Sequence, residues 1–253
     1  MRNRNLYVLT IVIVLLSLTL AACGRTASAT TTVRIATDAT WPPFEYVDES
    51  SKEIIGFDID LIKAIAENQN LNIEIVPVEW DALLAGVSQC QYDAAISAIT
   101  ITPERAQTML FSDPYINAGQ IVTVRSDNTA IQGPADLVGV ISGAQIGTTG
   151  AIEIENIAGA QLKTYDTVDL AYLDLINGQI AAVVADYPTA VNFVSQSNGR
   201  LVNVGDVFTD ESYGIAVCNK NTALRDQINL GLNAVISQGL ITQLEAEWLA
   251  VSE

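Results

Sequence analysis

From Val33 onward, short apolar segments typical of β-strands alternate with segments that have the period of an α-helix. Residues 33–37 have a strand pattern, and the apolar residues after Gly56 recur at three- and four-residue intervals, as in a helix. Strand, helix and strand patterns follow at 72–78, 80–88 and 93–96, and again, with one more helix, at 161–165, 168–177, 180–185 and 188–195. This alternation predicts an α/β fold with mostly parallel sheets.

A weak internal repeat suggests two similar units. Residues 84–96 and 173–184 each contain a helix pattern, a polar turn with a glutamine, and then a strand of small apolar residues. Ligands of open α/β sheets bind at the carboxyl ends of the strands. Two such units facing each other would form a cleft, with Thr100 and Arg105 on one wall and Asp186 on the other. Any two βα units share this pattern, so the repeat alone does not establish a duplication.

Residues 98–105 (Ala-Ile-Thr-Ile-Thr-Pro-Glu-Arg) place a cation where helix electrostatics does not favour one. Thr102 and Pro103 predict a helix N-cap and first helical residue. Arg105 would then lie in the first turn, near the positive end of the helix dipole. Beside free backbone N–H groups, an arginine can bind a carboxylate through two parallel hydrogen bonds. For this segment alone, a surface arginine that pairs with Glu104 or a nearby acid is an equally good interpretation.

Two segments in the second half are candidates for binding a charged ligand. Gly-Thr-Thr-Gly at 147–150 follows an apolar segment and precedes a predicted helix at 151–157, so backbone N–H groups there could meet a carboxylate. No lysine for phosphates is present, and a plain N-cap explains Thr149 equally well. Asp186 directly follows an apolar strand. Its carboxylate either caps the helix that begins near Pro188 or accepts an ammonium group.

The charge of the chain argues against nucleic acid as a partner. The first 22 residues hold two of the 12 basic residues and no acidic one, so the rest carries 10 basic against 29 acidic side chains, a net charge of −19. Such a charge opposes binding to nucleic acid, and no basic run reverses it locally. It is typical of a solubilised surface outside the cytoplasm.

Histidine is absent, which excludes Ser-His-Asp and Cys-His catalysis and the common zinc sites. We expect neither a metal nor a cofactor. Cys90 and Cys218 either pair in an oxidising compartment or remain separate and buried, and the sequence does not decide between these.

The N-terminus has the pattern of a secretory signal over residues 1–22: Arg2 and Arg4 precede an apolar segment that ends in small residues. The following Leu20-Ala-Ala-Cys23 resembles the lipobox of bacterial lipoproteins, which implies cleavage before Cys23 and acylation of that cysteine. The alternative is an uncleaved membrane anchor, but the apolar segment is barely long enough to span a membrane. Residues 23–32 are small and polar, as in a flexible tether.

Six motifs in order along the chain carry a family resemblance: Thr-Asp-Ala-Thr-Trp-Pro-Pro-Phe-Glu-Tyr at 37–46, Gly-Phe-Asp-Ile-Asp-Leu at 56–61, Thr-Ile-Thr-Pro-Glu-Arg at 100–105, Phe-Ser-Asp-Pro-Tyr at 111–115, Gly-Thr-Thr-Gly at 147–150 and Tyr-Gly-Ile-Ala-Val at 213–217. Together they resemble the family 3 solute-binding proteins of bacterial ABC transporters for polar amino acids. The resemblance implies a two-lobed periplasmic-binding-protein fold, with two mostly parallel sheets joined by two crossover strands. The first lobe would span 33–118 and 208–253, and the second 119–207.

The resemblance also implies how an amino acid would be bound at its α-carbon end. Arg105 and Thr100 would bind the α-carboxylate, helped by Thr149 from the opposite lobe. Asp186 and the Ala98 carbonyl would bind the α-ammonium.

At the other end, the resemblance implies that Trp41 and Phe57 flank the ligand side chain, by stacking on a planar group or covering an aliphatic one. Asp38 would face the distal end of the ligand. Glu45 and Gln145 are further candidates for that end, and the sequence cannot show whether they point into the cleft.

The resemblance implies a monomeric, extracytoplasmic lipoprotein that captures a free L-amino acid by hinge closure and delivers it to an ABC permease. Asp38 and Trp41 suit a guanidinium or an ammonium, which favours arginine or lysine, with glutamine next. One alternative is an enzyme, because the fold is similar to that of cyclohexadienyl dehydratases and Asp186 is a candidate acid. Another is a ligand-sensing subunit for a separate receptor.

Overall fold

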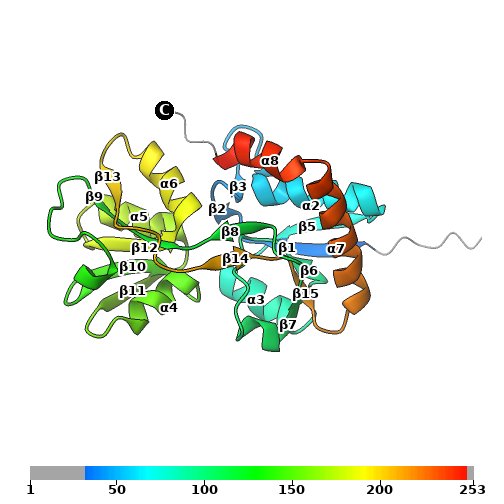
Figure 1. Ribbon diagram of the computed structural model, residues 1–253, viewed down its shortest axis with the longest axis horizontal. Helices are drawn as coiled ribbons and strands as arrows, with labels where there is room; N and C mark the ends of the chain where they lie inside the picture. The colour runs from blue at the N-terminus through cyan, green and yellow to red at the C-terminus, as the bar shows by residue number, and fades with distance from the viewer. Residues whose placement is uncertain (1–31, 250–253) are drawn as a thin grey trace, which may run out of the picture. The chain divides into compact units, whose positions relative to one another are not determined.

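Two five-stranded sheets organise the chain in the computed structural model, which describes residues 32–249 (Figure 1). The first sheet has the order β5-β1-β6-β15-β7 and contains β1 (Val33–Thr37), β5 (Ile73–Pro77), β6 (Ala94–Ala95), β7 (Met109–Phe111) and β15 (Ala216–Cys218). The second has the order β11-β10-β12-β9-β13 and contains β9 (Gln120–Arg125), β10 (Ile141–Gln145), β11 (Gln161–Tyr165), β12 (Ala182–Asp186) and β13 (Leu201–Val204).

Four of the five strands in each sheet run in one direction. The exceptions are β15 in the first sheet and β9 in the second, since each pairs antiparallel with both of its neighbours. The remaining pairings, of β1 with β5 and β6 and of β10 with β11 and β12, are parallel. The predicted α/β fold with two mostly parallel sheets is therefore confirmed.

Helices pack on both sheets. The first lobe, which we define as the first sheet and the helices around it, contains α2 (Phe57–Gln69), α3 (Trp80–Ser88), α7 (Thr222–Ser237) and α8 (Leu240–Leu244). The second lobe, defined in the same way, contains α4 (Thr149–Asn156), α5 (Val168–Ile176) and α6 (Tyr187–Gln196). A small third sheet, β2 (Thr40–Trp41), β3 (Glu45–Val47) and β4 (Ile54–Ile55), follows β1.

The two halves of the weak sequence repeat occupy equivalent places. One half includes α3 and β6 and the other α5 and β12, and each strand is the third in its sheet. Both strands therefore deliver the polar residues that follow them to corresponding edges of the two sheets. The sequence also predicted the bounds of α3 and β11 as the structure has them.

Two strands cross between the lobes, as predicted. β8 (Ile116–Ala118) leads from β7 into β9, and β14 (Glu211–Tyr213) leads from β13 toward β15. They pair antiparallel with each other and lie between the two sheets in Figure 1. The residue bounds predicted for the lobes, 33–118 with 208–253 and 119–207, stay a prediction. The predicted signal peptide (1–22), Cys23 and the tether (23–32, apart from Thr32) lie outside the described residues.

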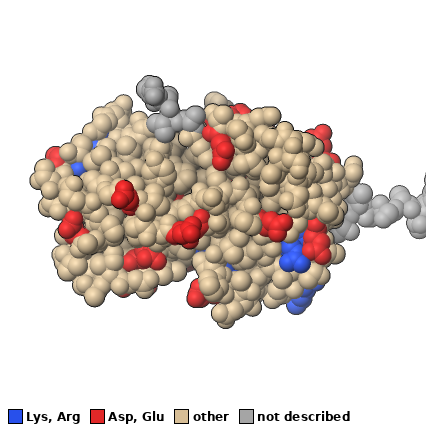
Figure 2. All heavy atoms as spheres, in the orientation of Figure 1, with Lys and Arg blue, Asp and Glu red and all other residues tan. Residues whose placement is uncertain are grey.

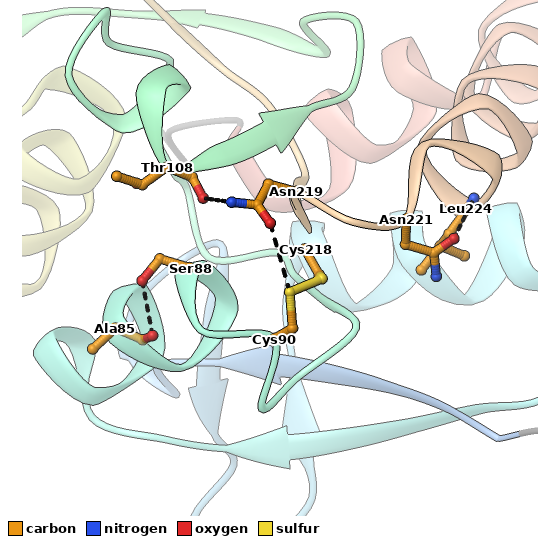
Figure 3. The surroundings of a disulfide bond; sticks show 8 residues. All are labelled: Ala85, Ser88, Cys90, Thr108, Cys218, Asn219, Asn221 and Leu224. Carbon is orange, nitrogen blue, oxygen red and sulfur yellow. Dashed lines mark hydrogen bonds between the residues drawn. A yellow bond between two sulfur atoms is a disulfide. The ribbon is translucent and has the colours of Figure 1, made fainter.

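A disulfide joins Cys90 to Cys218, which answers the question that the sequence left open (Figure 3). Cys90 lies in the turn after α3 and Cys218 ends β15, so the bond links two segments of the first lobe that are 128 residues apart in sequence. Beside it, the Asn219 side chain donates a hydrogen bond to the Thr108 carbonyl over 2.9 Å. The disulfide ties the end of β15 to the turn after α3, and the hydrogen bond ties the next residue to the one that precedes β7.

Candidate ligand-binding site

A pocket lies between the lobes, where the carboxyl ends of strands from both sheets meet. Its space measures about 290 Å³ including the opening to solvent. The first lobe contributes Asp38, Trp41, Trp80, Ser97, Ala98, Thr100 and Arg105, and the second contributes Gln145, Thr148, Thr149 and Asp186. Eight of the nine ligand contacts predicted from the sequence thus line one pocket, and Phe57 does not.

Thr102 caps a single helical turn, as predicted, but no longer helix follows it. Residues 105–107 form one turn of 3₁₀-helix, because the chain must enter β7 at Met109, and the Thr102 hydroxyl accepts a hydrogen bond from the Arg105 N–H over 3.2 Å. No helix dipole therefore acts at Arg105. Instead, its Nη1 donates to the Thr100 carbonyl (2.8 Å) and its Nη2 to the Gly147 carbonyl of the second lobe (3.2 Å).

Among the residues that the structure describes, the Arg105 guanidinium has no acidic partner in an ion pair. It lies 5.2 Å from the ring centre of Trp80, within cation–π range. None of the ion pairs found among residues 32–249 includes it, so the predicted alternative of pairing with Glu104 does not hold. Burial lowers the pKa of Arg105, and the carboxylates of Asp186 and Glu211 raise it.

Asp186 ends β12 and is 4% exposed. It precedes α6, but its side chain makes no capping hydrogen bond there, so the capping alternative is wrong. One carboxyl oxygen accepts a hydrogen bond from Gln120 Nε2 over 3.1 Å. Burial raises the pKa of Asp186 to about 7; the nearby Glu211 carboxylate adds to the rise, and Arg105 opposes it. A cation placed beside this carboxyl would favour its ionised form.

Thr148, rather than Thr149, caps α4. The Thr148 hydroxyl accepts a hydrogen bond from the Ala151 N–H over 3.3 Å, and Thr149 is the first residue of the helix. This leaves the Thr149 hydroxyl free to accept from Gln120 Nε2 (3.0 Å) and to donate to the Glu211 carboxylate (2.8 Å). The plain-cap interpretation of Thr149 is therefore wrong.

The other end of the pocket is rich in hydrogen-bond acceptors. Asp38, which follows β1, accepts from the Thr40 hydroxyl (2.9 Å) and, across the lobes, from Gln145 Nε2 (2.9 Å). Gln145 Nε2 also donates to the Asp166 carbonyl (2.9 Å), which fixes the orientation of the amide. The buried Gln145 Oε1 then has no hydrogen-bond partner among the described residues. Burial raises the pKa of Asp38, hydrogen bonds lower it, and nearby Glu79 and Asp169 raise it further.

Two indole rings, of Trp41 and Trp80, line the pocket. Phe57, which the sequence assigned to this role, is fully buried in the first lobe, where it packs edge-on against Phe44 and stacks on Tyr115. Sequence reasoning missed Trp80. Its signal was its position, because it begins a helix directly after the carboxyl end of a strand.

Buried acids hold the backbone behind the pocket. Ala98 has φ 46°, in the left-handed region that non-glycine residues rarely adopt, and its N–H donates to Asp58 Oδ2 over 2.7 Å. Tyr115 donates to the same oxygen over 2.9 Å. Glu45 does not line the pocket: it is fully buried and accepts from the Ser97 hydroxyl, which in turn accepts from the Asp38 N–H. Glu45 and Asp58 therefore act behind the pocket wall, and sequence reasoning missed Asp58.

The outer surface is acidic, as the composition predicts. Figure 2 shows acidic side chains as separate patches scattered over the visible face, and basic ones in fewer places. Within residues 32–249, no helix is long and apolar enough to span a bilayer, and no three or more His, Cys, Asp or Glu side chains are grouped to hold a metal ion.

Known proteins share both the sequence and the fold. ABC transporter arginine-binding protein 1 of Escherichia coli (strain K12) is 33% identical over 229 residues, which cover 88% of this chain and 92% of that protein. The structure of an ancestral arginine-binding protein bound to arginine is 35% identical, with a TM-score of 0.82, over 87% of this chain and 98% of that one. The structure of the ancestral amino acid-binding protein AncCDT-1, a precursor of cyclohexadienyl dehydratase, is 31% identical, with a TM-score of 0.80, over 87% of this chain and 96% of that one.

A family model matches almost all of the part of the chain that the structure describes. The match spans residues 33–251 and is to the bacterial extracellular solute-binding proteins, family 3. It includes every pocket residue named above. The chain therefore belongs to the family 3 bacterial extracellular solute-binding proteins.

Proposed function

We propose that this protein binds a basic L-amino acid in the pocket between its lobes, with arginine or lysine preferred and glutamine next. The observation that carries the proposal is the pair of opposite charges at one end of the pocket. Arg105 and Asp186 both line it, and neither forms an ion pair within residues 32–249. A zwitterion supplies what each of them lacks: a carboxylate for Arg105 and an ammonium for Asp186.

The rest of this end complements the same ligand. Thr100 and Thr149 line the pocket beside Arg105, one from each lobe. Because both hydroxyl groups donate to Glu211, we assign the backbone N–H groups of the two threonines, with Arg105, to the α-carboxylate. The Ala98 carbonyl, with Asp186, is assigned to the α-ammonium. Asp58 supports that assignment because it holds Ala98 in its left-handed conformation.

The preference for a basic side chain comes from the opposite end. A guanidinium or ammonium there would donate to Asp38 and to Gln145 Oε1, which has no hydrogen-bond partner among the described residues. The indole rings of Trp41 and Trp80, which also line the pocket, would add apolar and cation–π contacts. The negative charges of Glu79 and Asp169, which act on Asp38, also favour a cation. An amide such as that of glutamine could donate to the same acceptors but gains no ionic attraction, which places glutamine second. The names of the Escherichia coli and ancestral relatives support arginine.

Capture would proceed by hinge closure around the ligand. Two of the hydrogen bonds in the pocket already cross between the lobes, from Gln145 to Asp38 and from Arg105 to the Gly147 carbonyl. The crossover strands β8 and β14 would form the hinge. A ligand that contacts both lobes favours the closed form by the difference between its affinities for the two forms.

A thermal-shift screen of the twenty amino acids tests the proposal, because a ligand that binds only the folded state raises the melting temperature. We expect the largest shifts with L-arginine and L-lysine, a smaller one with L-glutamine, and none with their D-enantiomers. A screen in which no amino acid raises the melting temperature would contradict amino-acid binding.

We further propose that the protein is a monomeric lipoprotein, anchored outside the cytoplasm through Cys23, that delivers its ligand to an ABC permease. The lipobox-like sequence before Cys23 and the family membership support this. Mass spectrometry of the N-terminal peptide should show an acylated Cys23, and Cys23→Ala should lose the modification. Uptake of labelled ligand by permease-containing vesicles that requires the protein would separate transport from a sensing role.

A second candidate is a dehydratase on the same fold. It is favoured by one observation, namely that burial and Glu211 hold the pKa of Asp186 near 7, so the carboxyl could donate a proton to a leaving hydroxyl. The similarity to AncCDT-1, described as a precursor of cyclohexadienyl dehydratase, supports testing it. Incubation with prephenate or arogenate should give no product if the pocket only binds amino acids.

A further inference from the structure

Glu211 is a buried carboxylate on the crossover strand β14, and it lies outside the set of residues that line the pocket. In the antiparallel pairing of the two crossover strands, Glu211 lies opposite Ala118 of β8. Glu211 therefore belongs to the connection between the lobes. None of the ion pairs found among residues 32–249 includes it. Its charge is instead stabilised by hydroxyl groups.

Three hydroxyl groups donate to this carboxylate. Thr100 of the first lobe and Thr149 of the second both donate to Oε2, each over 2.8 Å, and Thr209 donates to Oε1 over 2.7 Å. One oxygen atom therefore bridges the two lobes through the side chains of two residues assigned to the ligand α-carboxylate. Hydrogen bonds to an ionised acceptor are about twice as strong as neutral ones.

The network continues to Asp186. Gln120 Nε2 donates both to the Thr149 hydroxyl (3.0 Å) and to Asp186 Oδ1 (3.1 Å). The Gln120 backbone N–H donates to the Thr209 hydroxyl over 2.7 Å. Since Thr209 in turn donates to Glu211, the network closes on that carboxylate. Glu211 is thus linked directly to Thr100 and Thr149, and through Thr149 and Gln120 to Asp186.

We propose that Glu211 is a positioning residue that couples the lobes at the α-amino-acid end of the pocket, acting through Thr100 and Thr149. Each threonine hydroxyl has a single hydrogen, and Glu211 accepts both of them, so the shared carboxylate holds in place the two residues whose backbone N–H groups we assign to the ligand. The two threonines therefore keep their places relative to each other only while the lobes are closed and Glu211 accepts from both. This inference rests on the proposed amino-acid binding and adds to it the residue that links closure to recognition.

A double-mutant cycle tests this coupling by calorimetry with L-arginine. Glu211→Gln keeps the size of the side chain but removes its charge, and Thr149→Val removes the hydroxyl. We expect each single variant to weaken arginine binding by about tenfold, the scale of one charge-assisted hydrogen bond. The double variant should be scarcely weaker than either, because both changes break the same link.

The matched control is Asp210→Asn, which removes the same charge from the exposed neighbouring residue. The arginine affinity of Asp210→Asn should stay within about twofold of that of the unaltered protein. When Asp210→Asn is combined with Thr149→Val, the changes in binding free energy should be additive. An unchanged affinity in Glu211→Gln, or additive effects of Glu211→Gln and Thr149→Val, would overturn the inference.

Failure of the proposed function would look different, because the unaltered protein would then bind no amino acid. Since Glu211→Gln could disturb folding, Glu211→Asp is the second variant: it keeps the charge but shortens the reach, and it should also weaken binding by at least about fivefold. If neither variant folds by circular dichroism, Glu211 serves the stability of the hinge and the inference is overturned.

Discussion

The two ends of the pocket hold their charges in different ways. At one end, Arg105 and Asp186 line the same space as opposite charges. Within residues 32–249 their side chains form hydrogen bonds with neutral groups only: backbone carbonyls for Arg105 and the Gln120 amide for Asp186. At the other end, Asp38 already accepts hydrogen bonds from Thr40 and Gln145. The first end is complementary to the groups that all amino acids share. The second can discriminate between side chains.

This difference implies unequal losses on substitution. Removing a charge at the first end leaves a ligand charge buried without a partner. Removing the Asp38 charge leaves its neighbours able to hydrogen-bond to a neutral ligand group. Affinity should therefore depend mostly on Arg105 and Asp186, and selectivity mostly on Asp38.

The largest expected effect is that of Arg105→Ala. The ligand carboxylate would lose its charged partner, and the affinity for L-arginine should fall by roughly 2–5 kcal/mol, by analogy with buried interfacial ion pairs. Isothermal calorimetry measures this directly. Arg125→Ala, which removes a cation that pairs with Asp127 at the surface, is the control and should bind normally. Normal affinity in Arg105→Ala would exclude it from the site.

The pH dependence of binding should be the next largest effect. The pKa of Asp186 is raised to about 7, so the folded protein holds this proton through the range in which the unfolded chain, with an ordinary pKa of 3.8, has released it. Asp186 therefore lowers the stability of the ligand-free fold as pH rises from about 4 to 7. The ligand ammonium needs the ionised form, so affinity should rise about tenfold per pH unit up to pH 7 and then level off.

Proton release identifies the group responsible for this pH dependence. At pH 6, calorimetry in buffers of different ionisation enthalpy should show close to one proton released for each arginine bound. Asp58, whose pKa burial also raises to about 7, lies behind Ala98 and should keep its proton. Binding at pH 6 without proton release would mean that Asp186 does not meet the ammonium.

Asp38→Asn should have a smaller and more selective effect. We expect arginine affinity to fall by about tenfold, since one charge-assisted contact is lost, and glutamine affinity to change by less than about threefold. Competition between the two ligands measures the ratio. Glu155→Gln removes an exposed acid on α4 and should leave the ratio unchanged. An equal loss of affinity for arginine and glutamine would mean that Asp38 has a purely structural role.

Glu45→Gln should have the smallest effect. Burial and the neighbouring Asp58 hold the pKa of Glu45 well above its usual range, which favours the neutral acid, and glutamine has nearly the same shape as that form. Arginine affinity should stay within about twofold, as read by calorimetry at pH 7. A large loss would place Glu45 in contact with the ligand, which its position behind Ser97 does not suggest.

The sequence predicted most of the fold because strands and helices have distinct apolar periods. It did not predict that the helix after Thr102 is only one 3₁₀ turn, since the nearness of β7 is a tertiary constraint. It also misplaced Phe57. Periodicity shows that this residue is apolar and helical, but not whether its side chain faces the core or the cleft.

The site was predictable where a strand end delivers a polar residue, as for Asp38 and Asp186. Asp58 and Glu211 could not be found in the same way, because they act on pocket residues from other elements: 40 residues away in sequence for Asp58 and Ala98, and 111 for Glu211 and Thr100. Cys90 and Cys218 show the same limit, since only the folded sheet brings them together.

Recognition of a basic amino acid at both ends is tested most directly by calorimetry with three ligands: L-arginine, agmatine, which lacks the carboxylate, and L-norvaline, which lacks the guanidinium. L-Arginine should bind at least about 100-fold more tightly than either analogue, since each loses a charged partner. Agmatine binding as tightly as arginine would contradict the role of Arg105. Norvaline binding as tightly as arginine would contradict the role of Asp38 in recognising the guanidinium.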